Sequence, residues 1–502
     1  MKKLILVCLV LAMLVSALSA CGNDTVDPVT GTTADQGTTP STEPEVTVAL
    51  DEYGRPVVES SLPDDLDYNN EQINIMIRTS NKERFTGVEG KEATAIEQVI
   101  YARNEAVMDK LNVYLNFVPI EQSGSDTKNY DTTIQGYLAG TGEMDIVTSY
   151  AYYTPALAIV GCFTNLNNVN MIDMTSIVWN QTFQESVAYE GALYFNVGDF
   201  SYDYTRQIVA TYFNKDLANN YFGSADLLYD MVKDNSWTME NAAAMLKDIH
   251  KDVNQDSIQD ADDFYGFILG ATSSPCEAMV TALGFNYTVK DNEGQYQLFQ
   301  MDTGLTDKID DLQAFIASEF CAPRSLWNWS GARDMFKKQS ALFYVATLDM
   351  ADQLADVDFD YGFLPLFKYN EAQENYCTGM GDSFSLQAIM SNCTDIERAG
   401  AVLQCLNEIS YKSLTPEYFD ILLKGRFADA PEDAEMLELL RSTVTLDFGR
   451  IYSGTLDRVT GNVWNNFVKI GGEYTKWYNE KSASTKELLV ALQQVLKGTA
   501  QN

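Results

Sequence analysis

The sequence predicts an α/β protein of two lobes, joined by strands that cross from one lobe to the other. Its 502 residues exceed what one hydrophobic core usually supports, so two lobes are expected. Strand-like and helix-like patterns alternate over residues 72–148, which is typical of a parallel sheet covered by helices. The stretch 189–217 reads as an apolar strand that breaks at Gly198 and resumes at Ile208, as a hinge between lobes would require.

The N-terminus has the pattern of a secretory signal peptide over residues 1–20. Lys2 and Lys3 precede an apolar run over residues 4–15, which is too short to span a membrane as a mature helix. The run leads into Leu-Ser-Ala-Cys-Gly, which resembles the lipobox of bacterial lipoproteins. This resemblance implies cleavage before Cys21 and a lipid anchor on its sulfur, at the extracellular face of the bacterial cytoplasmic membrane. The alternative is an ordinary signal peptide followed by a cysteine at that position by chance.

Residues 21–66 are rich in Thr, Pro, Asp, Gly and Ser, with almost no aromatic residue before Tyr53. Such a composition buries too little apolar surface to form a core. We therefore expect a flexible tether that holds the folded part away from the membrane.

Composition and charge exclude some partners. The chain carries 34 Lys and Arg against 71 Asp and Glu, a formal charge of -37. This charge repels phosphate backbones, so we expect no nucleic-acid partner, and a phosphate- or sulfate-bearing ligand fits poorly. Six cysteines remain besides Cys8 and Cys21, and none has a CxxC spacing. Disulfides and buried free thiols both remain open for these six.

The first lobe is predicted from the alternation itself. Residues 72–79 and 113–117 alternate as strands do, and an apolar stripe over residues 96–111 predicts a helix between them. A short helix over residues 130–139 and a strand over residues 144–148 continue the pattern. Ligands lie off the carboxyl ends of the strands in such sheets. The candidates in the loops after the first and third strands are Arg78, Tyr150, Tyr152 and Tyr153.

The hinge stretch supplies further candidates. It contains two apolar strands, over residues 192–195 and 208–213. Its midpoint would lie at the floor of the cleft between the lobes. Asp199, Tyr202 and Tyr204 fall in this midpoint.

The second lobe follows the hinge stretch. Thr238 is the expected N-cap of a helix, and helical periodicity runs over residues 306–320. A strong strand over residues 340–346 leads to Asp349, a further site candidate, and a strand over residues 361–366 is stopped by its proline.

The chain then returns to the first lobe and ends in helices. Asp382 precedes a strand over residues 384–390 and is the next site candidate. Thr394 with Glu397 and Ser484 with Glu487 have the spacing of capping boxes, which predicts a helix start at each. Another helix is expected to begin at Thr415-Pro416 and to end at Gly425.

An acidic stretch in the second lobe matches a twelve-residue calcium loop at its oxygen-bearing positions. The expected ligands are Asp252, Asn254, Asp256, Ile258 and Asp263. Two features differ from the usual pattern: the sixth position is Ser257 instead of glycine, and the twelfth is Asp263 instead of glutamate. The alternative is a solvated acidic loop. A structural Ca²⁺ and a solvated acidic loop are thus the two interpretations of this stretch. We expect no required cofactor.

The ordered motifs past the tether resemble a known family. Together with the lipobox at Cys21, they are YEGALY at 189–194, YFNKDL at 212–217, WT at 237–238, YGF at 265–267, ALF at 341–343 and YGFLP at 361–365. In this order they resemble the extracellular solute-binding proteins of bacterial ABC importers, family 1, related to maltose-binding protein. The resemblance implies a periplasmic-binding-protein-like (type II) fold with hinge strands, an interlobe cleft that closes on a solute, and delivery to an ABC transporter permease.

The resemblance also implies a domain organisation. The first lobe would contain residues 67–200 and 373–445, and the second lobe residues 201–372 and 446–502. About three crossings are expected, with returns near Tyr376 and Thr445. We expect a monomer that binds a small-molecule solute.

A carbohydrate is the expected solute, because sugars stack their C–H faces on aromatic rings and pair their hydroxyls with polar side chains. Tyrosines and the polar groups of Arg78, Asp199, Asp349 and Asp382 offer both kinds of contact. Trp464 is similar in position to the aromatic platform that carbohydrate-binding relatives carry near the C-terminus. The alternatives are that these residues only pack the core, or that Arg78 and Asp199 clamp an amino acid or peptide.

Enzymatic activity is not expected. The single histidine, His250, gives almost no material for histidine-based nucleophile activation or zinc chemistry, and no nucleotide-binding motif is present. A glycoside hydrolase would need only two carboxylates, so it remains the least favoured reading. A sensor-linked receptor has the same sequence features as an importer receptor.

Overall fold

A computed structural model describes residues 49–90, 92–121, 127–425, 430–457, 459–461 and 474–499. The chain divides into two units, residues 1–49 and Leu50–Asn502, and only Ala49 of the first unit is described. The signal peptide, Cys21 and the first part of the predicted tether therefore lie outside the described residues. Among the described residues, no helix is both long and apolar enough to cross a membrane.

The end of the predicted tether is packed on the folded unit. The Ser60 hydroxyl and the Ser61 N–H donate to the Glu408 carboxylate at 2.6 and 2.9 Å, and Leu62 is buried. Arg55 donates to the carbonyl of Tyr411 at 2.9 Å. Within the predicted tether, Arg55 and residues 60–62 thus pack on the folded unit.

Four strands form the first sheet, in the order β11-β3-β1-β2. They are β1 (Glu71–Arg78), β2 (Val113–Ile120), β3 (Ile146–Tyr150) and β11 (Ser385–Ile389). All four predicted strands are confirmed. β1 runs parallel to β2 and β3, whereas β11 is antiparallel to β3, with Ser385 opposite Tyr150. The parallel arrangement expected over residues 72–148 is confirmed by β1, β2 and β3. β11 adds an antiparallel edge, because this strand enters from a later crossing rather than through a helix of the same alternation.

Five strands form the second sheet, in the order β10-β4-β9-β6-β5. They are β4 (Val209–Asn214), β5 (His250–Lys251), β6 (Phe264–Leu269), β9 (Ala341–Thr347) and β10 (Tyr361–Leu364). β6 and β9 are parallel, and the other pairs are antiparallel. Every residue of β4, β6 and β9 is buried, which explains their continuous apolar sequences. A separate hairpin joins β7 (Thr288–Lys290) to β8 (Tyr296–Leu298).

Helices cover both sheets. They are α2 (Glu83–Thr86), α3 (Ala95–Leu111), α4 (Thr127–Leu138), α5 (Thr154–Ile159), α6 (Gln181–Val187), α7 (Asp203–Arg206), α8 (Lys215–Phe222), α9 (Asp226–Lys233), α10 (Met239–Leu246), α11 (Ser274–Ala282), α12 (Thr303–Ile316), α13 (Trp329–Lys337), α14 (Ile396–Thr415), α16 (Pro431–Ser442), α17 (Phe448–Ile451) and α19 (Tyr474–Thr499). Short 3-10 helices are η1 (Thr79–Asn81), η2 (Leu166–Asn168), η3 (Arg324–Leu326) and η4 (Leu348–Gln353), and η5 (Pro416–Lys424) is a π-helix.

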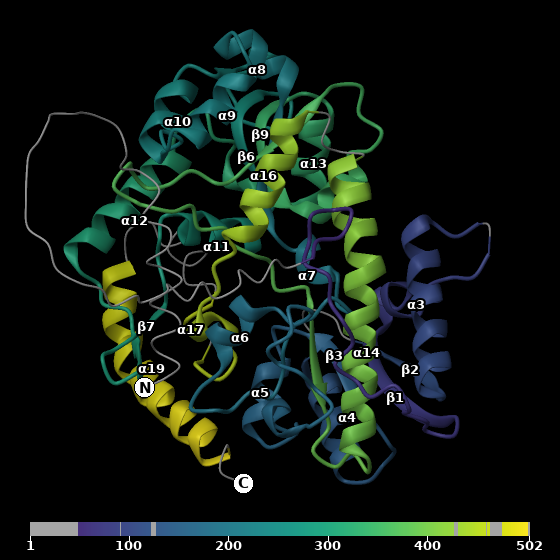
Figure 1. Cartoon of the computed structure of the whole chain (residues 1–502). Coiled ribbons are helices and arrows are strands. Elements are labelled where there is room, and N and C mark those ends of the chain that lie inside the picture. Colours follow the sequence, from purple (N-terminus) through teal and green to yellow (C-terminus); the bar gives the residue numbers. More distant parts are fainter. Residues whose placement is uncertain are drawn as a thin grey trace, which may run out of the picture. The chain divides into compact units, whose positions relative to one another are not determined.

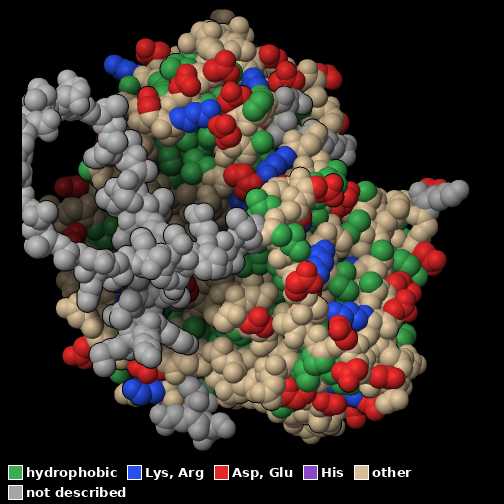
Figure 2. Space-filling view, in the orientation of Figure 1, with side chains coloured by type: hydrophobic (Ala, Val, Ile, Leu, Met, Phe, Trp, Pro, Cys, Tyr) green, Lys and Arg blue, Asp and Glu red, His purple; other side chains and the backbone are tan. Residues whose placement is uncertain are grey.

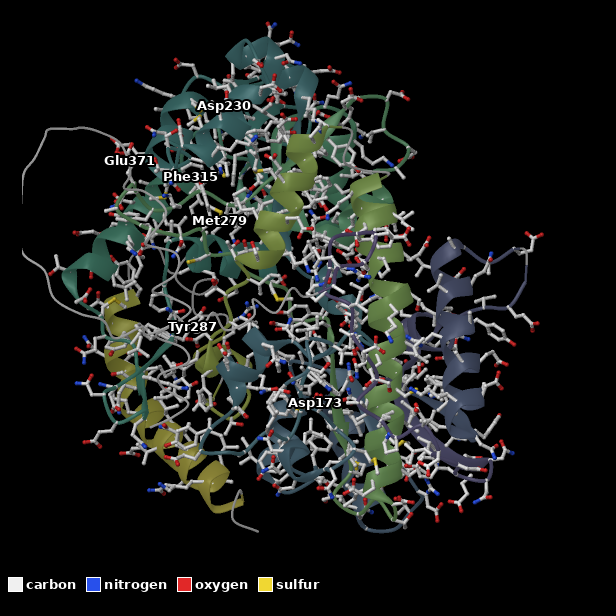
Figure 3. The ribbon with its side chains drawn as sticks, in the orientation of Figure 1. Asp173, Asp230, Met279, Tyr287, Phe315 and Glu371 are labelled. Atoms are coloured by element: carbon white, nitrogen blue, oxygen red, sulfur yellow. The ribbon has the colours of Figure 1, made fainter. Side chains whose placement is uncertain are left out.

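The helices lie with their own sheets. Figure 1 shows α14 alongside α3, and α8 to α10 gathered near β6 and β9. In Figure 3, Met279 of α11 and Phe315 of α12 lie among the elements of the five-stranded sheet, whereas Asp173 lies with those of the four-stranded sheet.

One of the predicted helix N-caps is confirmed, and the two predicted capping boxes are not formed. Thr238 caps α10 as expected, accepting from the N–H of Asn241 at 3.3 Å. α14 is instead capped by Asp395, and Glu397 accepts from the backbone of Met171, so the capping box of Thr394 is wrong. Ser484 lies inside α19, and η5 continues α14 without a new cap before it ends at Gly425. A capping box forms only at the N-terminus of a helix. Ser484 lies within a helix, and the Glu397 carboxylate bonds to another segment of the chain.

Three chain segments pass side by side between the two sheets. The N–H of Val209 donates to the carbonyl of Gly379 at 3.0 Å, and the N–H of Gly381 donates to that of Gln207 at 2.8 Å. Thr378 bonds in the same way to Thr443 and Thr445, at 2.8 and 2.9 Å. The expected hinge of about three crossings is therefore present, over residues 207–209, 378–381 and 443–445.

The apolar stretch 192–195 is not a strand, contrary to expectation. It forms isolated bridges and single bonds instead: the N–H of Leu166 donates to the carbonyl of Leu193, and Asn196 exchanges two backbone bonds with Gln387. An apolar run that is buried on all sides needs no long ladder, because several separate partners satisfy its backbone.

Replacing Glu408 with alanine should lower the free energy of unfolding by about 2 kcal/mol, because the N–H of Ser61 and the buried amide of Gln404 lose their acceptor. Chemical denaturation measures this change. The matched control is Glu487→Ala on the exposed face of α19, which should leave stability unchanged. Equal stability of the Glu408 variant and the parent would show that residues 50–66 are not held by this carboxylate.

Candidate functional site

A cavity of about 470 Å³ lies between elements of the two sheets. We call it the Trp329 cavity. It is lined by Tyr150, Tyr152, Gln207, Ser273, Ser274, Trp329, Thr347, Asp349, Met350, Asp382 and Ser383. Its volume falls in the range of small-molecule sites.

The sheet topology explains why these residues meet. β3 ends at Tyr150 and β9 ends at Thr347, so the loops that follow them lie at the strand ends where ligands bind in α/β sheets. β11 is antiparallel to β3, so Ser383 before its start lies beside Tyr150 at the end of β3. Gln207 comes from the first crossing, between the two sheets. The cavity therefore takes residues from both lobes and from the hinge.

Arg78 forms part of the wall behind the cavity and does not line it. Its guanidinium lies 4.6 Å from the ring centroid of Tyr150 and donates to the carbonyl of Ser383 at 3.3 Å. Burial lowers the pKa of Arg78. Tyr153 is also behind the wall, since it is buried and packs edge-on against Tyr152 with ring centroids 5.0 Å apart.

Two predicted carboxylates face the cavity from opposite lobes. Asp349 accepts from the Thr347 hydroxyl at 2.5 Å at the start of η4. Asp382 accepts from the Arg450 guanidinium at 2.8 Å, and its side chain remains 38% exposed. Each carboxylate is thus held by one fixed donor and retains further acceptor capacity.

Sequence reasoning missed the aromatic residue that stands furthest into solvent here. Trp329 begins α13 behind the N-cap Asn328 and is 37% exposed. An exposed indole offers an apolar ring face and a hydrogen-bonding N–H beside the polar cavity. The run Trp-Asn-Trp-Ser-Gly was visible in the sequence, but Trp327 is buried and only the structure distinguishes the two indoles. Gln207, Ser273 and Ser274 were missed as well, because nothing in their local sequence marks them.

The remaining hinge candidates lie outside the Trp329 cavity. Asp199 and Tyr204 line a smaller cavity of about 160 Å³, together with Arg441. The Thr415 hydroxyl donates to Asp199 at 2.5 Å, and burial raises the pKa of the Asp199 carboxyl to about 6. Tyr202 lines this small cavity and a third one described next. Trp464 lies outside the described residues.

A third cavity of about 750 Å³ also has walls from both lobes. We call it the Tyr418 cavity. It is lined by Ser80, Asn81, Glu83, Arg84, Thr94, Ala95, Ile96, Glu97, Ile100, Tyr202, Arg206, Asp352, Ala355, Glu417, Tyr418, Ile421 and Leu422. Arg206 pairs with Asp352 at 2.7 Å, so its charge is compensated within the wall.

The predicted calcium loop curls as such loops do, but its carboxylates already accept from the backbone. Asp252 accepts from the N–H groups of Asp256 and Ser257 at 3.2 and 2.9 Å. Ser257 has φ of 61°, which explains why glycine is usual at this position. Asp263 is buried and accepts from Val253 at 3.2 Å. In the described part of the chain, no three His, Cys, Asp or Glu side chains are arranged to hold a metal ion. The calcium site, including the Asn254 and Ile258 oxygens, stays a prediction.

Four cysteines of the folded unit favour buried free thiols over disulfides, the two alternatives that the sequence leaves open. Cys276, Cys321, Cys393 and Cys405 are buried free thiols. Burial raises the thiol pKa of Cys276 to about 12, which keeps it protonated and unreactive at neutral pH.

Solved structures of bacterial solute-binding proteins share this architecture. An ABC substrate-binding protein of Listeria monocytogenes in complex with cycloalternan matches 87% of this chain and 100% of its own, at 12% identity and a TM-score of 0.52. A cyclo/maltodextrin-binding protein complexed with maltotetraose matches 86% and 97%, at 12% identity and 0.53. UgpB of Mycobacterium tuberculosis, in complex with glycerophosphocholine, matches 85% and 99%, at 16% identity and 0.51. The chain has the fold of ABC-transporter solute-binding proteins. No family model and no curated protein matches its sequence.

Replacing Asp199 with asparagine should stabilise the protein at neutral pH. The folded state raises the pKa of this carboxyl to about 6, above the ordinary value, so the parent loses stability as pH rises from about 4 through 6. At pH 7.5 the free energy of unfolding of the variant should exceed that of the parent by about 2 kcal/mol. At pH 4 the variant should show no such gain. Denaturation at the two pH values measures the difference, with the exposed Asp65→Asn as control. A variant less stable than the parent at pH 7.5 would contradict this account.

Replacing Asp252 and Asp256 together with asparagine should lower the melting temperature only when calcium is present. A ligand at one hundred times its Kd stabilises a folded protein by about 2.7 kcal/mol, and the variant would lose this gain. Thermal unfolding with calcium or with chelator measures the effect, and Asp262→Asn serves as control in the same loop. If calcium leaves the melting temperature of the parent protein unchanged, the predicted metal site is ruled out.

Proposed function

We propose that this protein is a lipid-anchored extracellular receptor that binds a mono- or oligosaccharide between its lobes and delivers it to an ABC transporter permease. The observation that carries the proposal is the Trp329 cavity, in which aromatic rings and polar side chains from both lobes face one another. The anchor on Cys21 and the permease rest on the sequence resemblance.

The lining chemistry suits a neutral polyhydroxylated solute. Tyr150, Tyr152 and Trp329 offer ring faces for the C–H groups of a sugar. Asp349, Asp382, Gln207 and the serines at the start of α11 offer acceptors and donors for its hydroxyls. The negative charge of the chain opposes an anionic solute. The neighbours bound to cycloalternan and maltotetraose support a carbohydrate, whereas glycerophosphocholine in another shows that the fold accepts other solutes.

Binding would be coupled to closure of the lobes. The cavity walls belong to different sheets, and the three crossings of the hinge connect those sheets. A solute that contacts both walls binds best when they are close, so it shifts the population toward the closed state. A permease could then distinguish loaded from empty receptor.

A second proposal is a receptor for an amino acid or peptide, or a receptor that signals to a sensor. An amino-acid site needs an arginine free to clamp the carboxylate. Arg78 instead stacks on Tyr150 and bonds to Ser383, and Arg450 is paired with Asp382. Neither guanidinium is therefore free to bind a solute carboxylate. The carbohydrate proposal is therefore favoured. The structural neighbours are binding proteins, which agrees with a protein that is not an enzyme.

A thermal-shift screen over a library of mono- and oligosaccharides tests the proposal. At least one glycan should raise the melting temperature without being cleaved. Trp329→Ala should then weaken binding of that glycan by about fivefold or more, since an aromatic contact of this kind contributes about 1 kcal/mol or more. Trp464→Ala is expected to act in the same direction.

The control for Trp329→Ala is Tyr114→Ala, which removes a half-exposed aromatic residue of β2 that lines neither the Trp329 cavity nor the Tyr418 cavity. It should leave affinity unchanged. Stabilisation by amino acids and by no glycan would contradict the carbohydrate proposal, and release of shorter sugars would make the protein an enzyme.

A further inference from the structure

The side chain of Arg78 reaches across three strands of the four-stranded sheet, at the strand ends beside the Trp329 cavity. Arg78 is the last residue of β1, and β1 and β11 both lie next to β3. Neighbouring strands are about 4.8 Å apart, so β1 and β11 are separated by about 10 Å. Arg78 nevertheless contacts the ring of Tyr150 at the end of β3 and donates to the carbonyl of Ser383 just before β11. A long side chain is needed to make both contacts from β1.

The bond to Ser383 holds a part of the cavity wall that lies beyond the regular strand pairing. β11 begins at Ser385, and the N–H of Ala151 donates to the carbonyl of Phe384 at 3.0 Å. Asp382 and Ser383 line the cavity and precede these residues. Arg78 therefore joins the end of β3 to the entry of β11 at the point where the ladder has ended.

Asp203 of α7 supplies a negative charge near Arg78. Its carboxylate is buried and accepts from the N–H and the hydroxyl of Ser385 at 3.2 and 2.7 Å. Burial lowers the pKa of Arg78, and the charge of Asp203 is the strongest electrostatic influence in the opposite direction. The start of β11 is thus bonded to Asp203 through Ser385 and to Arg78 through Ser383.

Arg78 covers one face of the Tyr150 ring. Its guanidinium carbon lies 4.6 Å from the ring centroid, and Tyr150 lines the cavity whereas Arg78 does not. A sugar can therefore stack only on the face that the guanidinium leaves free. The Nε of Arg78 is buried and has no hydrogen-bond partner among the described residues, which is unfavourable for stability. The guanidinium thus stays on the ring although one of its donors is unpaired.

We propose that Arg78 is a positioning residue for solute binding, which holds the Tyr150 ring as a platform for the sugar without contacting the sugar itself. This inference rests on the proposed function and assigns a role to a residue outside the cavity lining. Without the guanidinium, the ring could tilt into the space behind it, and binding would have to order it again. A platform that is already ordered gives higher affinity, because less conformational freedom is lost when the solute binds.

Titration calorimetry on variants of Arg78 and Tyr150 tests the proposal. The probe is whichever of glucose, maltose, maltotriose, cellobiose and xylobiose binds the parent most tightly. Arg78→Met retains the aliphatic stem without the charge, Arg78→Lys retains the charge near Asp203 without the planar group, and Tyr150→Leu removes the ring. The control is Arg398→Lys, because Arg398 pairs with Glu71 at the other end of β1 and lines neither the Trp329 cavity nor the Tyr418 cavity.

Arg78→Met should weaken binding of the probe by about fivefold and Arg78→Lys by about threefold, whereas the control should bind as the parent does. Either Arg78 substitution should change the affinity by less than about 1.5-fold when it is added to Tyr150→Leu, because the ring on which Arg78 acts is then absent. Melting temperatures identify the folded variants. If Arg78→Met does not fold, the comparison is made with Arg78→Lys.

A residue that only stabilised the fold would give the same loss of affinity with and without the Tyr150 ring. Equal losses in the two backgrounds, or parent-like affinity of the folded Arg78 variants, would overturn the proposal and leave the carbohydrate receptor in place. A parent that binds none of the five sugars would overturn both.

Discussion

The backbone bonds between the three crossings are the constraint on which the rest of the structure depends. They join residues 207–209, 378–381 and 443–445 into one connection between the sheets. Gly381 permits this closeness, and Gly379 permits the approach of α11 to the second crossing. A Cβ at Gly379 would lie 2.6 Å from the Cα of Ala278, and one at Gly381 would collide with the Gln207 side chain. Because the crossings sit at the ends of β4 and β11, they also fix where the walls of the Trp329 cavity face each other.

Three arginines beside the cavities are each held by a partner in the wall. Figure 2 shows acidic side chains spread over the visible face of the described chain. Within the cleft region, Arg450 is paired with Asp382 and Arg206 with Asp352, while Arg78 is held on Tyr150. Pairing of this kind leaves hydrogen-bonding capacity without a strong net charge, which suits hydroxyl-rich solutes better than charged ones.

Much of the fold was predictable because its strands are either alternating or continuously apolar, and both patterns are local. β3, β9 and β11 were recognised in this way, and their ends gave Tyr150, Asp349 and Asp382. The direction in which a hinge side chain points depends on tertiary packing and not on local sequence. Asp199 was therefore expected on the cleft floor, yet it faces a small cavity beside Thr415. Trp329 and Gln207 were missed for the same reason, since exposure and proximity across lobes have no local signature.

The central claim is that the lobes close on a solute held between them. Small-angle X-ray scattering of the purified protein, without and with a saturating glycan chosen by thermal shift, tests it most directly. The account predicts that the glycan lowers the radius of gyration and shortens the longest interatomic distances. An unchanged scattering profile at saturation would contradict closure, because a solute that contacts both walls must favour the state in which they are close.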